Sequence, residues 1–310
     1  MTFHVVCLNP AVDVTFFIDG FTAGNVYPGQ RETLRPGGKG VNCARVLSQL
    51  GEKVHLLLPL GMGGECILED MESRCRCTVL QARGACRRTY NIMDRLSGRE
   101  TVISQTGPQA ESTVLPQLLD HIDNGMEAGD VLVLSGSVME GLPENVYAIL
   151  ARECERKHLR CALDCNATLL PANLGASYFF VKPNETELCA AMNVPDTEEP
   201  ERLLMLARRM PSRYCLVSMG ARGGLLASQE EAYVTELPAY KVRSTVGSGD
   251  AAFAGALSAI CRGKNMEEAL RLSMACGIDN ALKGMGGSVD LEQVEKLVSE
   301  IQINRMGGRA

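Results

Sequence analysis

The residues with the clearest capacity for chemistry are Gly247-Ser248-Gly249-Asp250, directly before an alanine-rich helical pattern. A glycine-rich turn at the start of a helix exposes backbone N–H groups and the positive end of the helix dipole, which together bind anions. An aspartate there can also simply cap the helix, because Asp is a preferred N-cap residue. A cap does not require three small residues before it. We therefore interpret the loop as an anion hole and Asp250 as a catalytic base.

A second glycine-rich segment, Pro36-Gly37-Gly38-Lys39-Gly40-Val41-Asn42, opens another helical pattern. It is not a Walker A loop, because that motif requires Ser or Thr after the lysine and Gly40 stands there. Glycines let a ligand approach the backbone closely, and Asn42 offers hydroxyl groups both a donor and an acceptor. The segment is a candidate binding loop, with a flexible hinge as the alternative.

A third segment, Lys182-Pro183-Asn184, ends a strand pattern, and Glu187 follows three residues after Asn184. On the first turn of a helix these two side chains share a face, where an amide and a carboxylate suit a hydrated Mg²⁺ that bridges nucleotide phosphates. The same pair can instead close a capping box. Taken by themselves, the residues favour the capping box.

Ser218, Gly220 and Gly223 form a glycine-rich turn after another strand pattern, where an α/β sheet would hold a nucleotide. The segment Gly61-Met62-Gly63-Gly64 is similar to half of a dinucleotide-binding fingerprint, but the third glycine and a well-placed acid are missing. The sequence therefore disfavours a dehydrogenase.

The elements that position these loops alternate between short apolar runs and longer amphipathic segments, which predicts a mostly parallel sheet with helices on both faces. Strands are expected at Phe3–Leu8, Val54–Leu58, Val131–Leu134, Cys161–Leu163, Phe179–Val181 and Cys215–Val217. Helices are expected at Val41–Leu50, Cys66–Ser73, Thr113–Asn124, Glu144–Lys157, Glu185–Met192 and Glu201–Met210. The last third is expected to be almost wholly helical, over Asp250–Arg262, Met266–Leu282 and Leu291–Ile301.

Two stretches, 12–35 and 87–105, break the alternation with short segments of period two and no helix between them. Inserted into an α/β core, such strands can pair as a small sheet over a pocket. No proline-, glycine- or serine-rich linker separates independent domains. We expect one domain over residues 1–310 with these two segments as its lid.

The bulk composition excludes several classes of protein. With 45% hydrophobic and 22% charged residues and a net charge of −6, the chain is neither disordered nor a general binder of nucleic acid or anionic membranes. No apolar run approaches the ~20 residues of a membrane span, and the N-terminus lacks a signal-peptide pattern. Thirteen cysteines without zinc-finger spacing and four scattered histidines indicate reduced thiols in a cytoplasmic protein and no structural metal.

At these loops the sequence resembles the ribokinase-like (PfkB-type) carbohydrate kinase family, and the resemblance covers nearly the whole chain. Gly37–Asn42 matches the N-terminal motif of the family, and Thr245–Asp250 matches its C-terminal motif, with Ser248 where alanine is commoner. Asn184 with Glu187 matches its N-x-x-E element, and Ser218 to Gly223 its nucleotide turn. Leu8–Asp13 and Cys276–Ala281 fit the 1-phosphofructokinase/tagatose-6-phosphate kinase branch.

The resemblance implies a three-layer α/β/α sandwich with a β-sheet lid, an ATP and Mg²⁺ requirement, and a homodimer joined through the lids. It implies that Asp250 takes the proton of a sugar hydroxyl while the backbone of 247–249 stabilises the transferring phosphoryl group. It puts the nucleotide near Lys182, Asn184, Glu187, Ser218, Gly220, Gly223 and Asn280, with Glu187 holding Mg²⁺ indirectly. It puts the sugar near Asp13, Gly37, Gly38 and Asn42, and a substrate phosphate near Lys39 and Arg88. Arg87 is a further candidate for that phosphate, since neighbouring guanidinium groups suit a dianion.

One departure bears on the acceptor. The branch usually carries an arginine shortly after the first lid strand, and this chain has Pro28 there, so that cation is absent unless Arg31 replaces it. We expect a kinase of a phosphorylated ketohexose, fructose 1-phosphate before tagatose 6-phosphate. A kinase of an unphosphorylated sugar or nucleoside is the alternative, and a non-catalytic sugar-phosphate sensor is disfavoured because binding alone needs no base.

Overall fold

The apolar strands predicted from the sequence lie side by side in one sheet. The computed structural model describes residues 1–307, and its large sheet has eleven strands in the order β15-β14-β13-β12-β11-β10-β9-β1-β4-β5-β8. The neighbours from β4 to β12 are all parallel. These six are β4 (Val54–Met62), β1 (Phe3–Val6), β9 (Val131–Ser135), β10 (Arg160–Asp164), β11 (Tyr178–Val181) and β12 (Ser212–Ser218).

Five strands at the two ends of this sheet were not predicted. They are β5 (Arg76–Ala85), β8 (Gln109–Ala110), β13 (Gly224–Ala227), β14 (Ala232–Glu236) and β15 (Gln302–Arg305). From β12 to β15 every pairing is antiparallel. The expectation of an almost wholly helical last third therefore misses β15. Four of the five are partly exposed, and the buried β13 has only four residues, so their pairing partners define them more than their own pattern does.

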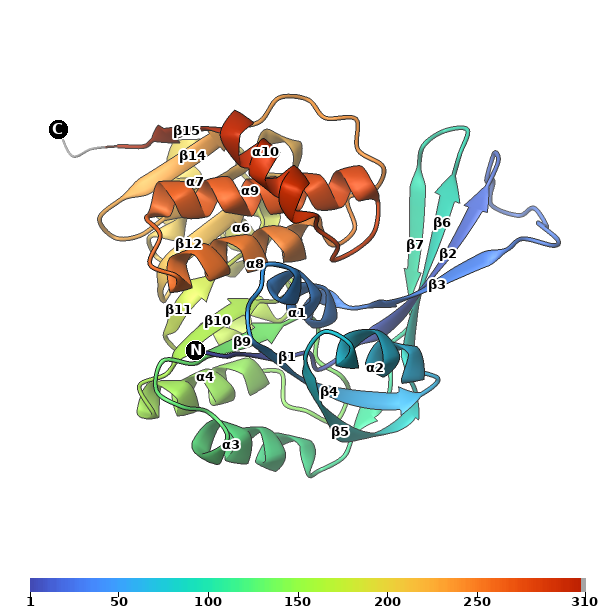
Figure 1. Ribbon diagram of the computed structural model, residues 1–310, viewed down its shortest axis with the longest axis horizontal. Coiled ribbons are helices and arrows are strands. Elements are labelled where there is room, and N and C mark those ends of the chain that lie inside the picture. Colours follow the sequence, from blue (N-terminus) through green and yellow to red (C-terminus); the bar gives the residue numbers. More distant parts are fainter. Residues whose placement is uncertain (308–310) are drawn as a thin grey trace.

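Helices cover both faces of the large sheet and produce the three layers seen in Figure 1. One layer contains α1 (Lys39–Gln49), α2 (Glu65–Glu72), α8 (Ser248–Cys261), α9 (Met266–Lys283) and α10 (Leu291–Glu300), which share one apolar core. The other contains α3 (Val114–Asn124), α4 (Val146–Arg156), α5 (Leu170–Asn173), α6 (Glu185–Ala191) and α7 (Pro200–Ala207), around a second core. The predicted three-layer α/β/α fold is confirmed.

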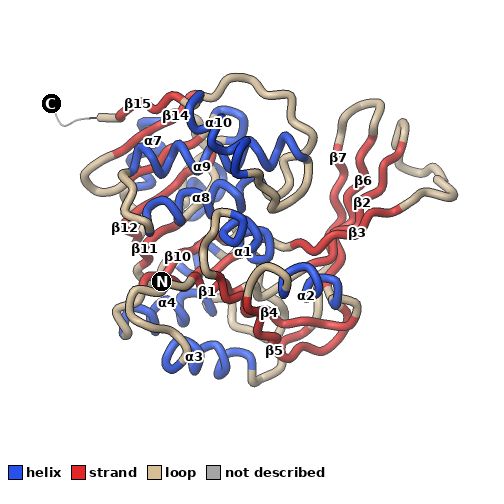
Figure 2. The backbone as a smooth tube through the Cα atoms, in the orientation of Figure 1, coloured by secondary structure: helices blue, strands red, loops and turns tan. Residues whose placement is uncertain are grey.

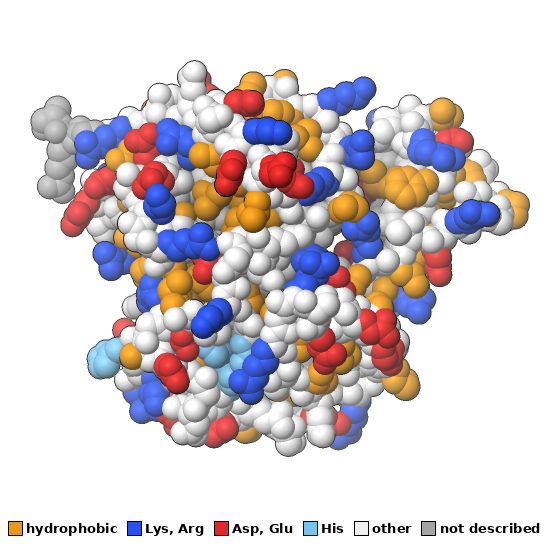
Figure 3. Space-filling view, in the orientation of Figure 1, with side chains coloured by type: hydrophobic (Ala, Val, Ile, Leu, Met, Phe, Trp, Pro, Cys, Tyr) orange, Lys and Arg blue, Asp and Glu red, His pale blue; other side chains and the backbone are white. Residues whose placement is uncertain are grey.

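Four strands form a separate small sheet that projects from the main body (Figures 1 and 2). Its order is β3 (Glu32–Gly37), β2 (Ala11–Ile18), β6 (Arg87–Asp94) and β7 (Glu100–Ser104). All four strands come from the two stretches that break the α/β alternation of the sequence. Apolar side chains lie exposed on this projection (Figure 3), among them Phe17, Leu34, Val102 and Ile103.

Within residues 1–307, no helix has both the length and the apolar character needed to cross a membrane. The thirteen cysteines are all free thiols, and most are buried. They act as small apolar side chains inside the two cores.

Candidate active site

Polar residues gather where the parallel strands end and helices α1 and α8 begin. Asn9, Ser135, Asp164 and Lys182 each lie at or just beyond the carboxyl end of a strand in the large sheet. Neighbouring parallel strands end at the same edge, so the fold brings these residues together. The two glycine-rich loops lie at the same edge of the sheet, at the starts of α1 and α8.

Asp250 is the third residue of α8, and the N-cap position belongs to Gly247. Gly247 has a φ of 77°, and a Cβ there would lie 2.6 Å from the backbone nitrogen of Gly287, so the turn requires glycine. The Asp250 carboxylate makes no capping hydrogen bond. It is only 5% exposed, and burial raises its pKa above the ordinary value. The capping alternative for this aspartate is therefore wrong.

Asn42 holds the Asp250 carboxylate from the opposite loop. Its Nδ2 donates to Asp250 Oδ2 at 2.9 Å, and its Oδ1 accepts from Nη1 of Arg45 at 3.1 Å. Because the guanidinium can only donate, the amide is fixed with its NH₂ toward Asp250. Arg45 is itself held by Asp70 and by the carbonyl of Pro36. The sequence reading missed Arg45, which lies three residues after Asn42 on α1.

Two lysines converge on one buried carboxylate. Nζ of Lys39 lies 3.0 Å from Asp164 Oδ1, and Nζ of Lys182 lies 3.4 Å from the same oxygen. Burial disfavours the charge of Lys39, but the carboxylates of Asp164, Asp250 and Glu187 outweigh it and raise its pKa. Lys39 is therefore a cation, and both lysines act to lower the pKa of the nearby Asp250. The sequence-based prediction assigned no role to Asp164.

Asp13, on β2, lies against the first glycine loop. A Cβ on Gly37 would come within 2.1 Å of Asp13 Oδ2, so the contact exists only because Gly37 has no side chain. Gly38 adopts a φ of 97°, which also favours glycine. Burial raises the pKa of Asp13 to about 6, with Arg87 opposing the shift and Asp250 adding to it.

Arg87 and Arg88 are adjacent on β6, so their side chains leave opposite faces of the small sheet. Asp13 is in register with Thr89 on one side and with Arg35 on the other. Thr89 and Arg87 are two residues apart, which puts Arg35, Asp13 and Arg87 on one face. The structure thus brings Arg87 to the site and turns Arg88 to the other face. Arg35 is a cation that the sequence reading missed.

Several buried polar atoms at this edge lack partners. Among residues 1–307, six buried side-chain nitrogen or oxygen atoms make no hydrogen bond. Four of the six belong to this site: Asn9 Oδ1, Arg87 Nε, Ser135 Oγ and Asp164 Oδ2. Leaving such an atom unpaired costs about 1–3 kcal/mol. Their concentration here indicates a polar ligand that completes their hydrogen bonds.

A cavity of about 590 Å³ opens between the turn after β12 and the start of α8. Ser218, Gly220 and Gly223 of that turn line it, together with Ser248 and Gly249 of the loop before Asp250. The remaining walls are largely apolar, including Leu237, Val242, Met274, Ile278 and Ala281. An apolar slot that ends at an anion-binding loop suits a flat heterocycle with a phosphate chain.

The Asn184 and Glu187 pair forms a complete capping box at the start of α6. Asn184 Oδ1 accepts from the N–H of Glu187 at 2.7 Å, and Glu187 Oε2 accepts from the N–H of Asn184 at 2.8 Å. Glu187 remains close enough to Lys39 to raise its pKa. The pair is thus structural in this state, and Glu187 Oε1 is outside the capping bonds.

Asn280 is fully buried behind the glycine-rich loop of residues 247–249. Its Nδ2 donates to the carbonyl of Val246 at 2.8 Å and to Oγ of Ser248 at 3.1 Å. Its Oδ1 accepts from the N–H of Ser288. These bonds hold the loop in position.

The family model for pfkB family carbohydrate kinases matches residues 3–284 of this chain. A Staphylococcus aureus protein assigned as a phosphofructokinase is 26% identical over 100% of both chains, with a TM-score of 0.82. Phosphofructokinase-2 from Escherichia coli, solved with substrates and products, is 23% identical over 97% of this chain and 99% of its own, with a TM-score of 0.87. A Thermotoga maritima protein assigned as a 1-phosphofructokinase is 21% identical over 99% and 100%, with a TM-score of 0.82.

Proposed function

The chain belongs to the pfkB family of carbohydrate kinases, and from that premise we propose that it transfers the γ-phosphate of ATP to a phosphorylated ketohexose. The observation that carries this proposal is the position of Asp250. It directly follows Ser248 and Gly249, which line the cavity, and it lies beside Asp13, Lys39 and Asn42. A base between two binding regions is what direct phosphoryl transfer requires.

In the proposed step, the Asp250 carboxylate accepts the proton of a sugar hydroxyl as its oxygen attacks the γ-phosphorus. A new P–O bond forms to the sugar, the bond to the β-phosphate oxygen breaks, and ADP leaves. The N–H groups of Gly247 and Gly249 and the dipole of α8 stabilise the negative charge on the transferring group. The N–H of Ser248, which the sequence placed with them, already donates to the carbonyl of Thr245. The ammonium groups of Lys39 and Lys182 add positive charge beside Asp250.

Nucleotide binding is assigned to the 590 Å³ cavity, with the base against its apolar walls and the phosphates toward Gly249. Lys182 stands near that end, since a Cβ on Gly249 would lie 3.5 Å from Nζ of Lys182. The free oxygen of Glu187 and the Asn184 amide suit the water shell of a Mg²⁺ ion, which keeps several waters and would neutralise phosphate charge. Asn280 contributes by bracing the loop.

The acceptor is assigned to the other side of Asp250. Asp13, Gly38 and Asn42 are placed to bind sugar hydroxyls, and Arg87 with Lys39 to bind a phosphate. Arg35 is on the face of the small sheet that carries Asp13, so it is a better replacement for the cation missing at Pro28 than Arg31 at the tip. These cations favour a phosphorylated acceptor, and the resemblance to the 1-phosphofructokinase branch favours fructose 1-phosphate, with tagatose 6-phosphate next.

We further propose that residues 1–310 form one kinase domain in which the small sheet acts as a lid. Its exposed apolar residues, Phe17, Leu34, Val102 and Ile103, fit a homodimer joined through two lids. Analytical ultracentrifugation of wild type and a Val102→Glu, Ile103→Lys variant tests this assembly. A monomeric wild type would contradict it.

A coupled ADP assay over a panel of acceptors tests the proposed function. The panel contains fructose 1-phosphate, tagatose 6-phosphate, fructose 6-phosphate, free fructose, ribose and a nucleoside, each with ATP and Mg²⁺. We expect the highest kcat/KM with fructose 1-phosphate. A higher value with an unphosphorylated acceptor would support the alternative favoured by Pro28, and no turnover with any acceptor would indicate a sensor.

A further inference from the structure

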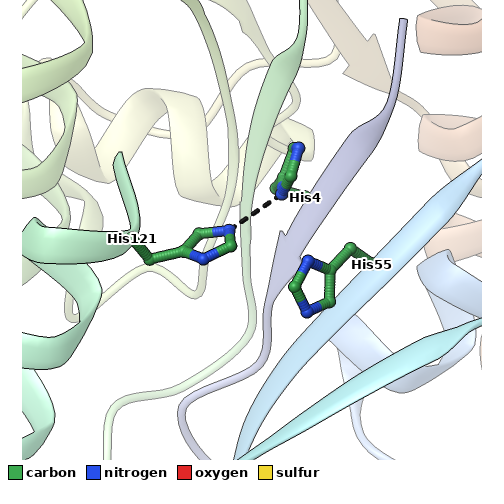
Figure 4. A group of neighbouring side chains, drawn as sticks. All are labelled: His4, His55 and His121. Atoms are coloured by element: carbon green, nitrogen blue, oxygen red, sulfur yellow. Dashed lines mark hydrogen bonds between the residues drawn. The ribbon is translucent and has the colours of Figure 1, made fainter. Parts of the chain in front are cut away.

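Three of the four histidines, scattered in the sequence, meet under α3. His4 and His55 are in register on the neighbouring strands β1 and β4, and His121 comes from the last turn of α3. Figure 4 shows their rings turned toward one another. The ring centroids are 4.9 to 5.4 Å apart, so the three imidazoles form a nearly equal-sided triangle.

Outer partners orient two of the rings. His4 Nε2 lies 3.1 Å from Asp130 Oδ2, and His55 Nε2 lies 2.8 Å from Thr78 Oγ1. A carboxylate only accepts, so His4 carries its proton on Nε2 and a lone pair on Nδ1. That Nδ1 faces His121 Nε2 at 2.8 Å. A carboxylate behind an imidazole, with the other ring nitrogen presented inward, is the usual outer support of a metal-binding histidine.

We propose that His4, His55 and His121 form a binding site for Zn²⁺, separate from the phosphoryl-transfer site. One nitrogen from each ring lies within 4.8 Å of the others. Ligand nitrogens around tetrahedral zinc are about 3.3 Å apart, because each Zn–N bond is about 2.0–2.1 Å long. One pair is 2.8 Å apart and no pair exceeds 4.8 Å, so side-chain shifts on the order of 1 Å bring the three nitrogens to that spacing.

The surroundings provide access and suitable protonation. His4 and His55 are buried, whereas His121 lines a surface cavity of about 350 Å³ that Thr78 also lines. A water molecule entering from this cavity can serve as the fourth ligand. Burial lowers the pKa of all three imidazoles, to about 4 for His55 and His121, so they are in the neutral form that binds metals. Asp130 and Asp120 offset the positive charge of Arg76.

Without metal, the same residues form a hydrogen-bond chain in which His121 Nε2–H donates to His4 Nδ1 and His4 Nε2–H donates to Asp130. Zinc would occupy the place of the first of these protons, and His121 would carry its proton on Nδ1 instead. No net proton is lost in this exchange. The ion would link β1, β4 and α3. It would lie away from the active site, because His4 precedes Asn9 by five residues, about 16 Å of extended chain.

Zinc titration of the full-length protein tests the proposal. Protein stripped with a chelator and kept reduced is titrated with ZnCl₂ by calorimetry, beside His121→Asn and the matched control His158→Asn. His158 lies outside the cluster and has a φ of 54°, which asparagine also tolerates. We expect the His121→Asn protein to bind one zinc ion fewer than wild type and the control to bind the same number. Asp130→Asn should weaken this one site by about 10- to 100-fold.

Two readouts on wild type separate this site from thiol sites among the thirteen cysteines. Co²⁺ substitution should give the visible bands of a tetrahedral site without a thiolate charge-transfer band, and zinc X-ray absorption should show nitrogen and oxygen neighbours only. Thermal unfolding should shift upward with Zn²⁺ and not with Mg²⁺, which prefers oxygen ligands. Equal zinc stoichiometry in wild type and His121→Asn, or sulfur neighbours around the only bound zinc, would overturn the proposal, leaving a hydrogen-bond chain.

Discussion

Asn42 Nδ2 donates a hydrogen bond of 2.9 Å to Oδ2 of Asp250, although the two residues are 208 positions apart in the sequence. The bond joins the start of α1 to the start of α8 and fixes the direction of the proposed base. Around it, Lys39, Lys182 and Arg45 supply positive charge or hydrogen bonds. The functional predictions depend on this arrangement.

Replacing Asp250 with asparagine removes the base and preserves its shape. We expect kcat to fall by about 10²- to 10⁴-fold, the usual contribution of general acid–base catalysis. The KM values for ATP and sugar phosphate should change little. Steady-state kinetics beside the exposed control Asp196→Asn would check this, and an unchanged kcat would show that another group takes the proton.

The Asn42→Ala substitution removes a donor to the Asp250 carboxylate. That hydrogen bond lowers the pKa of Asp250 against the effect of burial, so its loss should raise this pKa further. Since the base acts when ionised, the acidic limb of the kcat profile should move to higher pH. A profile from pH 5 to 9 in both proteins measures the shift. A fall in kcat that is equal at every pH would contradict the proposed link.

The Asp13→Asn substitution should make the protein more stable at pH 8 but less active. Burial raises the pKa of Asp13 to about 6 in the folded state, against 3.8 for the ordinary group. Protonated Asp13 therefore stabilises the folded state, fully below pH 3.8, and this stabilisation is lost as the pH rises through about 6. At neutral pH the ionised carboxylate lowers the stability of the fold. The cost is at most about 3 kcal/mol, because one pKa unit corresponds to about 1.4 kcal/mol.

Asparagine should therefore raise Tm at pH 8, flatten the dependence of Tm on pH between 4 and 6, and lower kcat/KM for the sugar. Thermal unfolding at several pH values checks the first two effects, and a lower Tm at pH 8 would contradict them.

Arg87→Ala should weaken binding of a phosphorylated acceptor. Removing a charge-assisted contact costs about 1.5–3 kcal/mol, which corresponds to a rise in KM of about 10- to 150-fold. Arg88→Ala should have a smaller effect, because its side chain leaves the opposite face of β6. Kinetics with fructose 1-phosphate compare both with Arg202→Ala on the exposed face of α7. A larger effect at Arg88 would reverse the assignment.

Ala221→Trp tests the nucleotide cavity. Ala221 is exposed on the turn after β12 and lines the mouth of the cavity, so an indole there should obstruct ATP without disturbing the core. We expect the KM for ATP to rise by about tenfold or more, equivalent to about 1.4 kcal/mol, while the KM for the sugar stays the same. An unchanged KM for ATP would place the nucleotide elsewhere.

The sequence by itself determined the local parts of this protein. Strand–helix alternation predicted the parallel centre of the large sheet, and Gly247-Ser248-Gly249 predicted a tight turn at the start of α8. Both follow from short-range effects, namely hydrophobic periodicity and the backbone freedom of glycine. Strands β13 to β15 were missed because they have only four or five residues each, too few for a clear pattern of their own.

Only the tertiary structure decided which distant side chains meet. Asp164 with its two lysines, and Arg45 behind Asn42, come together through strand order and helix packing, which no local pattern encodes. The histidines at 4, 55 and 121 show this most clearly. They appeared scattered, and the expectation of no structural metal depended on spacing alone. The register of β1 with β4 and the packing of α3 place their rings around one point, because contacts across a sheet depend on topology and not on separation along the chain.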